Sequence, residues 1–160
     1  MRIAVLTLTR DRLDYTKHCF DRLHRFAGCD FDHWILDQAS TDDTAGWLDD
    51  EYEPAHRGSV YYTVMGENVG ISEGMNTLLA ADDDMLEEYD VIVKFDNDCE
   101  LTQPNTLRDV AHLAYEGGAL LSPRILGLQT PPLATRELAI NQEVILDVPQ
   151  IGGIFLAAPA

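Results

Sequence analysis

Short apolar runs alternate with segments whose apolar residues recur at helical spacing along most of the chain. The runs have the length of buried strands and are bounded by polar residues. We predict strands at Ile3–Leu6, Trp34–Leu36, Val60–Val64 and Val91–Phe95. The last of these is apolar throughout except for Lys94, which indicates a strand buried on both faces.

The segments between these runs carry apolar stripes that are typical of amphipathic helices. The stripes consist of Leu13, Phe20, Leu23 and Phe26, then Ile71, Met75, Leu78 and Leu79, and then Leu107, Val110, Ala111 and Ala114. Ser40 and Asp43 form an S-x-x-D capping box that we expect to open a helix after the second strand, a role that accounts for both residues. We expect Pro104 at the first position of the helix that carries Leu107.

The order of strands and helices predicts an α/β fold, a Rossmann-like αβα sandwich with a mainly parallel central sheet. Ligands of such folds bind outside the carboxyl ends of the strands, so polar residues that follow a strand are site candidates. After Gly117 and Gly118, prolines interrupt the pattern, and only Val144–Val148 and Ile151–Ala157 suggest further strands. We see no repeat or linker and predict a single domain over residues 1–160.

The charge of the chain narrows the classes of partner. Acidic residues number 28 against 11 basic ones, a net charge of −17, and such a field repels nucleic acid and anionic membrane surfaces. It also repels a nucleotide diphosphate, so an anionic ligand would need a local counter-charge such as a metal ion. We assign most of the acidic residues to solubility.

The cysteines and the N-terminal segment bear on the compartment. Cys19, Cys29 and Cys99 lack a CxxC spacing, which argues against a disulfide framework and a structural zinc site and for a reducing compartment. No apolar run has the length needed to cross a bilayer, and the start of the chain is typical of a strand rather than of a signal peptide. We therefore expect a cytoplasmic protein.

Polar residues end the first two predicted strands. Thr7, Thr9 and Arg10 follow the first strand, where hydroxyls and a guanidinium can hold a ribose, a base or a phosphate. Capping of the next helix by Thr9 or Asp11 explains these residues about as well. Asp37 directly follows the second strand, and we interpret it as free to accept hydrogen bonds from a base or a ribose.

Two carboxylates follow the fourth predicted strand in the order Asp96-Asn97-Asp98. At positions i and i+2 of an extended segment they would point to the same side, where together they can bind a hard divalent cation. Such an ion neutralises a departing diphosphate as a Lewis acid. A D-x-D alone indicates a metal site only weakly because acidic turns are common, but its position after a central strand strengthens the indication. Lys94 lies on the same side as Asp96, and we favour an ion pair between them over a role in ligand binding.

The segment from Asn68 to Asn76 joins the third predicted strand to a helix. Gly70 permits a tight turn, and the N-terminus of the following helix can attract an anion. The segment is neither a G-x-G-x-x-G fingerprint nor a P-loop. By itself it indicates only a loop that enters a helix.

Taken together and in order, these segments resemble glycosyltransferase family 2. The family's D-[NDG]-x-S-x-D-x-T segment is similar to the run from Asp37 to Thr44, although Gln38 stands where the family often has Asn, Asp or Gly. Its N-x-G-x-x-x-[AG]-x-N segment is similar to Asn68–Asn76, and its D-x-D is similar to Asp96–Asp98. Its first strand also ends in a polar turn that contains Thr. Three motifs in the right order on the expected elements are far more specific than any one of them.

The resemblance implies a GT-A fold, a nucleotide diphosphate sugar as donor with UDP-sugars favoured, and an inverting transfer to a carbohydrate or other hydroxyl acceptor, assisted by Mn²⁺ or Mg²⁺. It implies nucleotide-sugar binding by Thr7, Thr9, Arg10, Asp37, Asn68, Gly70, Asn76 and Asp96, with Asp37 on the base. It implies metal binding by Asp96 and, as the principal ligand, by Asp98.

The late part of the family's pattern is matched only in part. Ile151–Leu156 resembles the family's Gly-rich strand beside the acceptor, and the family usually places an acidic segment with the general base after it. An inverting displacement needs such a base within hydrogen-bond reach of the acceptor hydroxyl. Glu143 and Asp147 are the carboxylates near that strand, and we assign neither. We therefore expect a donor site, an acceptor part that is short or missing, and no identified catalytic base.

Three other interpretations stay open. A haloacid-dehalogenase-like phosphohydrolase also has a D-x-D after a strand, but early in the chain and followed by Thr or Val rather than by Cys99. A nucleotidyltransferase would need a Gly-rich basic loop after the first strand. A non-catalytic nucleotide-sugar-binding module would bind the donor without turnover.

Histidine and tryptophan residues add no further site. The five histidines show no pair with the spacing of metal ligands, and we expect them on the surface or partly buried. Trp34 and Trp47 lie within apolar patterns, so we expect both in the core and not on a sugar-binding surface.

Overall fold

The computed structural model of the chain describes residues 1–82, 84–123, 136–140, 143–147 and 155–160. Strands and helices alternate over the first part of the chain, as the sequence predicts. The elements are β1 (Ile3–Thr9), α1 (Leu13–Phe26), β2 (Asp32–Asp37), α2 (Thr44–Trp47), the π-helical η1 (Leu48–Tyr52), α3 (Glu53–Ala55), β3 (Val60–Val64), α4 (Gly70–Leu79), α5 (Met85–Glu88), β4 (Val91–Phe95), α6 (Thr106–Gly117), β5 (Arg136–Ile140), β6 (Glu143–Asp147) and β7 (Phe155–Pro159). Within the described ranges, no helix combines the length and the apolar character that crossing a membrane requires.

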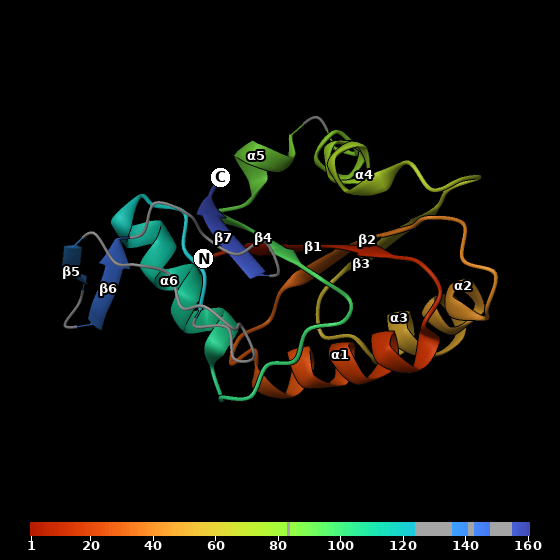
Figure 1. Cartoon of the computed structure of the whole chain (residues 1–160), viewed down its shortest axis with the longest axis horizontal. Helices are drawn as coiled ribbons and strands as arrows, with labels where there is room; N and C mark the ends of the chain where they lie inside the picture. The colour runs from red at the N-terminus through yellow and green to blue at the C-terminus, as the bar shows by residue number, and fades with distance from the viewer. Residues whose placement is uncertain (83, 124–135, 141–142, 148–154) are drawn as a thin grey trace.

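Five strands form the central sheet in the order β3-β2-β1-β4-β7. β1 pairs in parallel with β2 and with β4, and β2 pairs in parallel with β3. β7 runs antiparallel to β4, and β5 and β6 form a separate antiparallel pair. The prediction of a mainly parallel sheet is confirmed. Parallel pairing brings the carboxyl ends of β1 to β4 to one edge of the sheet, which is at the right in Figure 1.

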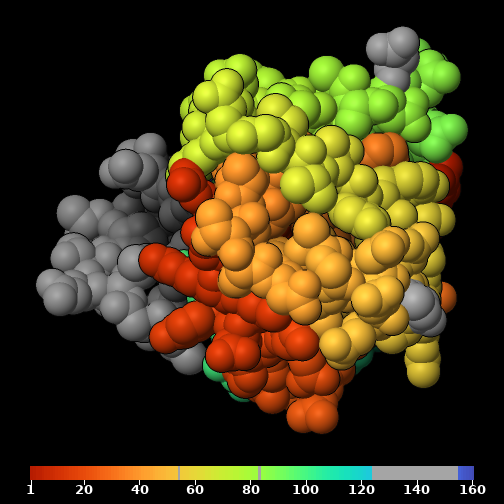
Figure 2. All heavy atoms as spheres, turned by 90° about the vertical axis from the view of Figure 1, so that its right-hand side faces the viewer, coloured from red at the N-terminus to blue at the C-terminus, as the bar shows by residue number. Residues whose placement is uncertain are grey.

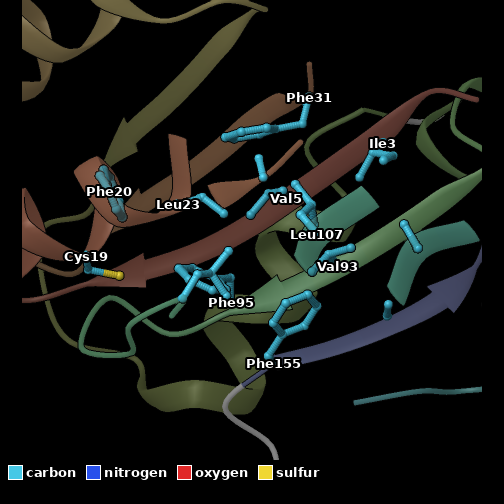
Figure 3. Close-up of a cluster of buried hydrophobic side chains, with 14 of the residues drawn as sticks. Ile3, Val5, Cys19, Phe20, Leu23, Phe31, Val93, Phe95, Leu107 and Phe155 are labelled. Atoms are coloured by element: carbon cyan, nitrogen blue, oxygen red, sulfur yellow. The ribbon is translucent and has the colours of Figure 1, made fainter. Parts of the chain in front are cut away.

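Helices cover both faces of this sheet (Figure 1). α1 and α6 lie on one face together with the short helices from α2 to α3, and α4 and α5 lie on the other. Successive side chains of a strand point to opposite faces, so Val5 and Val93 pack toward α1 and α6 (Figure 3), whereas Leu6 packs with Leu78 of α4. The predicted αβα layering is confirmed.

The predicted strands lie where the sequence places them. β3 and β4 have the predicted bounds, and β1 extends beyond its predicted end to Thr9. Of the later expectations, β6 covers Val144–Asp147, and β7 begins at Phe155. The rest of those two predicted strands, Val148 and Ile151–Ile154, lies outside the described residues.

Two predicted helix starts are wrong. α2 begins at Thr44 without a side-chain cap from Asp43, because the Ser40 hydroxyl bonds to Asp37 and to the backbone N–H of Asp11 instead of closing a capping box. α6 begins at Thr106 and not at Pro104, because Asn105 between them has a left-handed backbone conformation, with φ of 65°, that no α-helix continues through.

The predicted apolar stripe of α4 is only partly buried. Leu78 is 3% exposed, whereas Ile71 is 68% exposed and Leu79 is 38% exposed. α4 touches the sheet at Gly74, where a Cβ atom would lie 3.1 Å from the side chain of Leu8. The helix therefore approaches the sheet most closely at its middle, and its first turn projects past the core.

The expectation for the histidines is wrong for His33, which is fully buried. Its Nε2 lies 2.9 Å from the Thr7 hydroxyl, and its Nδ1 lies 2.6 Å from the Tyr52 hydroxyl. That hydroxyl is also 3.0 Å from Nε2 of His24, which lies 2.9 Å from Nδ1 of His56. Histidines that are far apart in the sequence thus form one polar cluster beneath the sheet. The expectation that both tryptophans belong to the core is confirmed.

Candidate functional site

Buried polar side chains join the ends of β1 and β2. Thr9 and Asp37 are partners in the parallel register, and the Thr9 hydroxyl donates to Asp37 Oδ2 over 3.0 Å. Asp37 also accepts hydrogen bonds from the backbone N–H of Ser40, at 2.8 Å, and from its hydroxyl. The carboxylate is fully buried with both oxygens engaged. The interpretation of Asp37 as free to accept hydrogen bonds is therefore wrong, since its side chain holds the β2–α2 loop in place.

The β1–α1 turn is clamped to that loop by hydrogen bonds in both directions. The backbone N–H of Asp11 donates to Ser40 Oγ over 2.7 Å. Asp11 Oδ1 in turn accepts from the N–H of Thr41, at 2.7 Å, and from its hydroxyl, at 3.1 Å. These bonds from Thr41 lower the pKa of the Asp11 carboxyl below its ordinary value. The N–H of Leu13 donates to Asp42 Oδ2 over 2.9 Å, so the neighbouring loop, and no residue of the turn itself, caps the start of α1.

The clamped turn has an unusual backbone. Asp11 and Arg12 both adopt the left-handed conformation, with φ of 53° and 60°, which is uncommon for residues with a Cβ atom. Arg10 is half exposed, with its Nε 3.9 Å from Asp11 Oδ2. Arg12 extends across the edge of the sheet, and its Nη1 lies 3.4 Å from Asp98 Oδ2. Sequence reasoning missed Arg12 because no motif marks it.

The D-x-D segment forms a turn directly after β4. The N–H of Cys99 donates to the Asp96 carbonyl over 3.4 Å, so the expected extended conformation of this segment is wrong. Asp96 forms the predicted ion pair with Lys94, and Asp98 pairs with Arg12. The side chains of Asp96 and Asp98 are 39% and 48% exposed, which leaves both carboxylates accessible to a cation.

Contacts with α1 fix this turn in place. Asn97 Nδ2 donates to the Thr16 hydroxyl over 3.0 Å. The thiols of Cys19 and Cys99 both donate to the Asp96 carbonyl oxygen, over 3.3 Å and 3.1 Å. The hydrogen bond with Cys99, together with burial, raises the pKa of the Cys19 thiol far above its ordinary value, so this thiol stays protonated. The backbone and the middle residue of the turn thus anchor it, while its two carboxylates remain outside the core.

The third loop, between β3 and α4, is tied to the second. Val69 N–H donates to Gln38 Oε1 over 3.1 Å, a contact that uses the length of the Gln side chain. Asn68 Oδ1 accepts from the N–H of Gly70 over 2.9 Å. Gly70 has φ of 82°, a conformation that favours glycine. Asn76 lies farther along α4 and has an exposed side chain.

Most of the predicted site residues therefore lie at one sheet edge, on the ends of strands, on the loops that follow them or on α4. Figure 2 faces this edge and shows the β1–α1 turn, the β2–α2 loop and the start of α4 against one another. Thr7 is the exception, because its side chain is fully buried and its hydroxyl is bonded to His33 in the core.

The chemistry of this edge suits a hard divalent cation in part. Carboxylate oxygens such as those of Asp96 and Asp98 are ligands that Mg²⁺ and Mn²⁺ prefer. Over the described ranges, however, no group of three or more His, Cys, Asp or Glu side chains is arranged to hold a metal ion. The two carboxylates fit an ion that completes its coordination with water and with the phosphates of a ligand.

Comparison with known proteins identifies the family. The sequence matches the family described as Glycosyl transferase family 2 over residues 4–133. No curated protein sequence matches the chain.

Solved structures of similar architecture include two glycosyltransferases. TarS 1-349 of S. aureus superposes with a TM-score of 0.69 at 17% identity, covering 98% of this chain and 46% of that one. Its complex with UDP-GlcNAc gives a TM-score of 0.65 at 17% identity, over 86% of this chain and 39% of that one. The mannosyltransferase PcManGT from Pyrobaculum calidifontis, in complex with GDP-Man and Mn²⁺, gives a TM-score of 0.58 at 19% identity, over 68% of this chain and 31% of that one. The chain thus spans less than half the length of these proteins. With the family match over most of its length, the chain belongs to glycosyltransferase family 2, and its architecture is the GT-A fold.

Proposed function

We propose that this chain binds a nucleotide diphosphate sugar, with UDP-sugars favoured, and serves its transfer to a hydroxyl acceptor. One observation carries the proposal. The three segments that match family motifs lie far apart in the sequence, yet contacts link them at one edge of the sheet. Thr9 bonds to Asp37, Gln38 bonds to Val69, and α1 holds the turn after β4. Such an edge is where ligands of parallel α/β sheets bind.

In this proposal, different loops contact different parts of the donor. Thr9 and Asp37 shape the floor beside the base, and the half-exposed Arg10 offers a guanidinium to ribose or phosphate. Asn68 and Gly70 form the opposite wall, and the open space around Gly70 leaves room for close approach of a ligand to the backbone. Asn76 extends that wall along α4.

Asp96 and Asp98 bind Mn²⁺ or Mg²⁺ in this proposal, with Asp98 as the principal ligand. The ion, when bound, neutralises charge on the departing diphosphate. Two observations support it: the net charge of −17 opposes binding of an unassisted diphosphate, and PcManGT has been solved with GDP-Man and Mn²⁺. Direct attack of the acceptor hydroxyl opposite the diphosphate would invert the anomeric centre. A cytoplasmic location, which the free cysteines favour, belongs to the same proposal.

Isothermal calorimetry tests the donor site with UDP, GDP and their sugar conjugates, each with and without Mn²⁺. We expect binding that depends on Mn²⁺ and weakens by about tenfold or more in Asp98→Ala, since a charged ligand of the ion is lost. Asp50→Ala, which removes an exposed carboxylate of η1, should bind as the wild type does. A folded wild-type protein that binds no nucleotide would overturn the proposal. Tight binding without release of nucleotide diphosphate in the presence of acceptors would favour the non-catalytic module.

A further inference from the structure

We propose that Arg12 is an exchangeable counter-ion of the donor site: it pairs with Asp98 in the metal-free protein, gives up that carboxylate to the divalent ion, and then binds the donor's diphosphate. This inference rests on the proposed function and assigns a donor-binding role to a residue outside the family motifs.

The contact between the two side chains is suited to exchange. Arg12 Nη1 lies 3.4 Å from Asp98 Oδ2, and the two side chains are 65% and 48% exposed. An ion pair at such exposure is weak because water screens it. Since most of its surface faces solvent, the guanidinium can leave the carboxylate through side-chain rotation alone.

The backbone of Arg12, in contrast, is fixed. The left-handed conformation at Asp11 and Arg12 persists because hydrogen bonds with Ser40, Thr41 and Asp42 surround it. Strained backbone that its surroundings hold in place is concentrated at functional sites. β1 and β4 are also adjacent parallel strands, so the turn after β1 presents Arg12 beside the turn that carries Asp98.

Among the basic side chains that the structure describes at this edge of the sheet, Arg12 is the one that pairs with Asp98. Lys94 is paired with Asp96, and Arg10 lies beside Asp11. A divalent ion on Asp98 repels the guanidinium, so Arg12 and the ion compete for this carboxylate. A bound diphosphate removes this competition, because its negative charge attracts both the ion and the guanidinium. The planar guanidinium can donate hydrogen bonds to two phosphate oxygens at once.

The model of exchange predicts effects of opposite sign in one variant. In Arg12→Gln, Mn²⁺ alone should bind about two- to tenfold more tightly, because a competing positive charge is gone. UDP in the presence of saturating Mn²⁺ should bind about five- to fiftyfold more weakly, because a charge-assisted hydrogen bond is lost. Arg12→Lys, which keeps the charge without the planar fork, should bind Mn²⁺ as the wild type does and UDP with intermediate affinity.

Both affinities can be measured on the whole chain. Electron paramagnetic resonance of free Mn²⁺ gives the affinity for the ion, and calorimetry gives the affinity for UDP. Arg25→Gln is the matched control, because it removes the same charge from an exposed residue in the last turn of α1. Opposite shifts in Arg12→Gln alone would support the inference. Unchanged affinities, or shifts shared with Arg25→Gln, would overturn it while leaving the proposed function intact. A wild-type protein that binds neither Mn²⁺ nor UDP would overturn both.

Discussion

Thr9 and Asp37 end two neighbouring parallel strands and share a buried hydrogen bond of 3.0 Å. Because Asp37 also accepts two hydrogen bonds from Ser40, this one carboxylate joins the last residues of β1 and β2 to the loop that clamps the β1–α1 turn. The position of Arg12, and through it the surroundings of Asp98, depends on this joint.

Asp37→Asn should therefore weaken both folding and nucleotide binding. The amide keeps one acceptor oxygen and places an NH₂ group against donors, which leaves at least one buried polar group unsatisfied. We expect a loss of about 1–3 kcal/mol in the free energy of unfolding, measured by urea denaturation, and weaker UDP binding by calorimetry. Asp43→Asn, an exposed change in the same segment, should alter stability by less than about 0.5 kcal/mol. Equal stability of the two variants would contradict the role of Asp37.

The contrast between Asp37 and the strands around it shows what the sequence can predict. Burial makes the central run Val91–Phe95 apolar apart from Lys94, so this strand could be located from composition alone. β3 lies at the edge of the sheet and is half-buried or exposed along its length, and its β-branched and aromatic residues mark Val60–Val64 as a strand. The partner of a polar residue depends on which loops meet, and the spacing from Asp37 to Ser40 and Asp43 fits a capping box equally well. Only the parallel register, which brings Thr9 beside Asp37, shows that Asp37 and Ser40 stabilise the loop and that no capping box forms.

Arg12 shows a second limit of sequence reasoning. Its left-handed backbone belongs to a residue type that rarely adopts it, and its partner Asp98 is distant in the chain. Neither composition nor periodicity encodes such a contact. Asn105 is a similar case, since its positive φ moved the start of α6 away from Pro104.

Gly28 should be intolerant of a side chain. It follows α1 with φ of 78°, and a Cβ atom there would lie 2.6 Å from the Cα atom of Asn105, a backbone contact that cannot move aside cheaply. Gly28→Ala combines left-handed strain with overpacking, and we expect a loss of about 2–4 kcal/mol in unfolding free energy. Gly66→Ala is the control, since no atom lies within 4 Å of its Cβ position. A thermal midpoint for Gly28→Ala equal to that of Gly66→Ala would show that the end of α1 and the start of α6 do not pack as described.

Two residues of the same apolar stripe on α4 should differ sharply in their contribution to stability. Leu78→Ala removes a side chain that is 3% exposed, and we expect a cost of about 2–4 kcal/mol from lost burial and the resulting cavity. Ile71→Ala changes a side chain that is 68% exposed and should stay within about 0.5 kcal/mol of the wild type. Urea denaturation of both variants tests the placement of α4, and similar losses in the two would refute it.

The polar cluster beneath the sheet has one proton arrangement that satisfies its contacts with all histidines neutral. His56 Nε2 lies 2.8 Å from the Phe31 carbonyl, which only accepts, so Nε2 carries the proton and Nδ1 accepts from His24 Nε2. The Tyr52 hydroxyl then donates to His33 Nδ1. An added proton on His56 Nδ1 would set its N–H against the N–H of His24 Nε2.

Burial accordingly disfavours the charged form of each imidazole. It lowers the pKa of His24 to about 4, with a further contribution from His56. It lowers the pKa of His33 well below its ordinary value of 6.5, and it lowers that of His56 although the Phe31 carbonyl opposes the shift. In the unfolded chain all three titrate near their ordinary value.

Stability should therefore be fully present above pH 6.5, the ordinary value, and should fall as the pH drops toward 4, the folded value of His24. In this window the unfolded chain binds protons that the folded chain does not. The fully buried His33 alone adds a slope of up to about 1.4 kcal/mol per pH unit. Urea denaturation from about pH 7.5 to about pH 5 measures the slope above the range in which carboxylates mainly titrate. A double variant of the exposed histidines, His18→Gln with His112→Gln, should keep the slope. Stability that stays constant over this range, or a slope that disappears in the double variant, would mean that the buried cluster does not hold its histidines neutral.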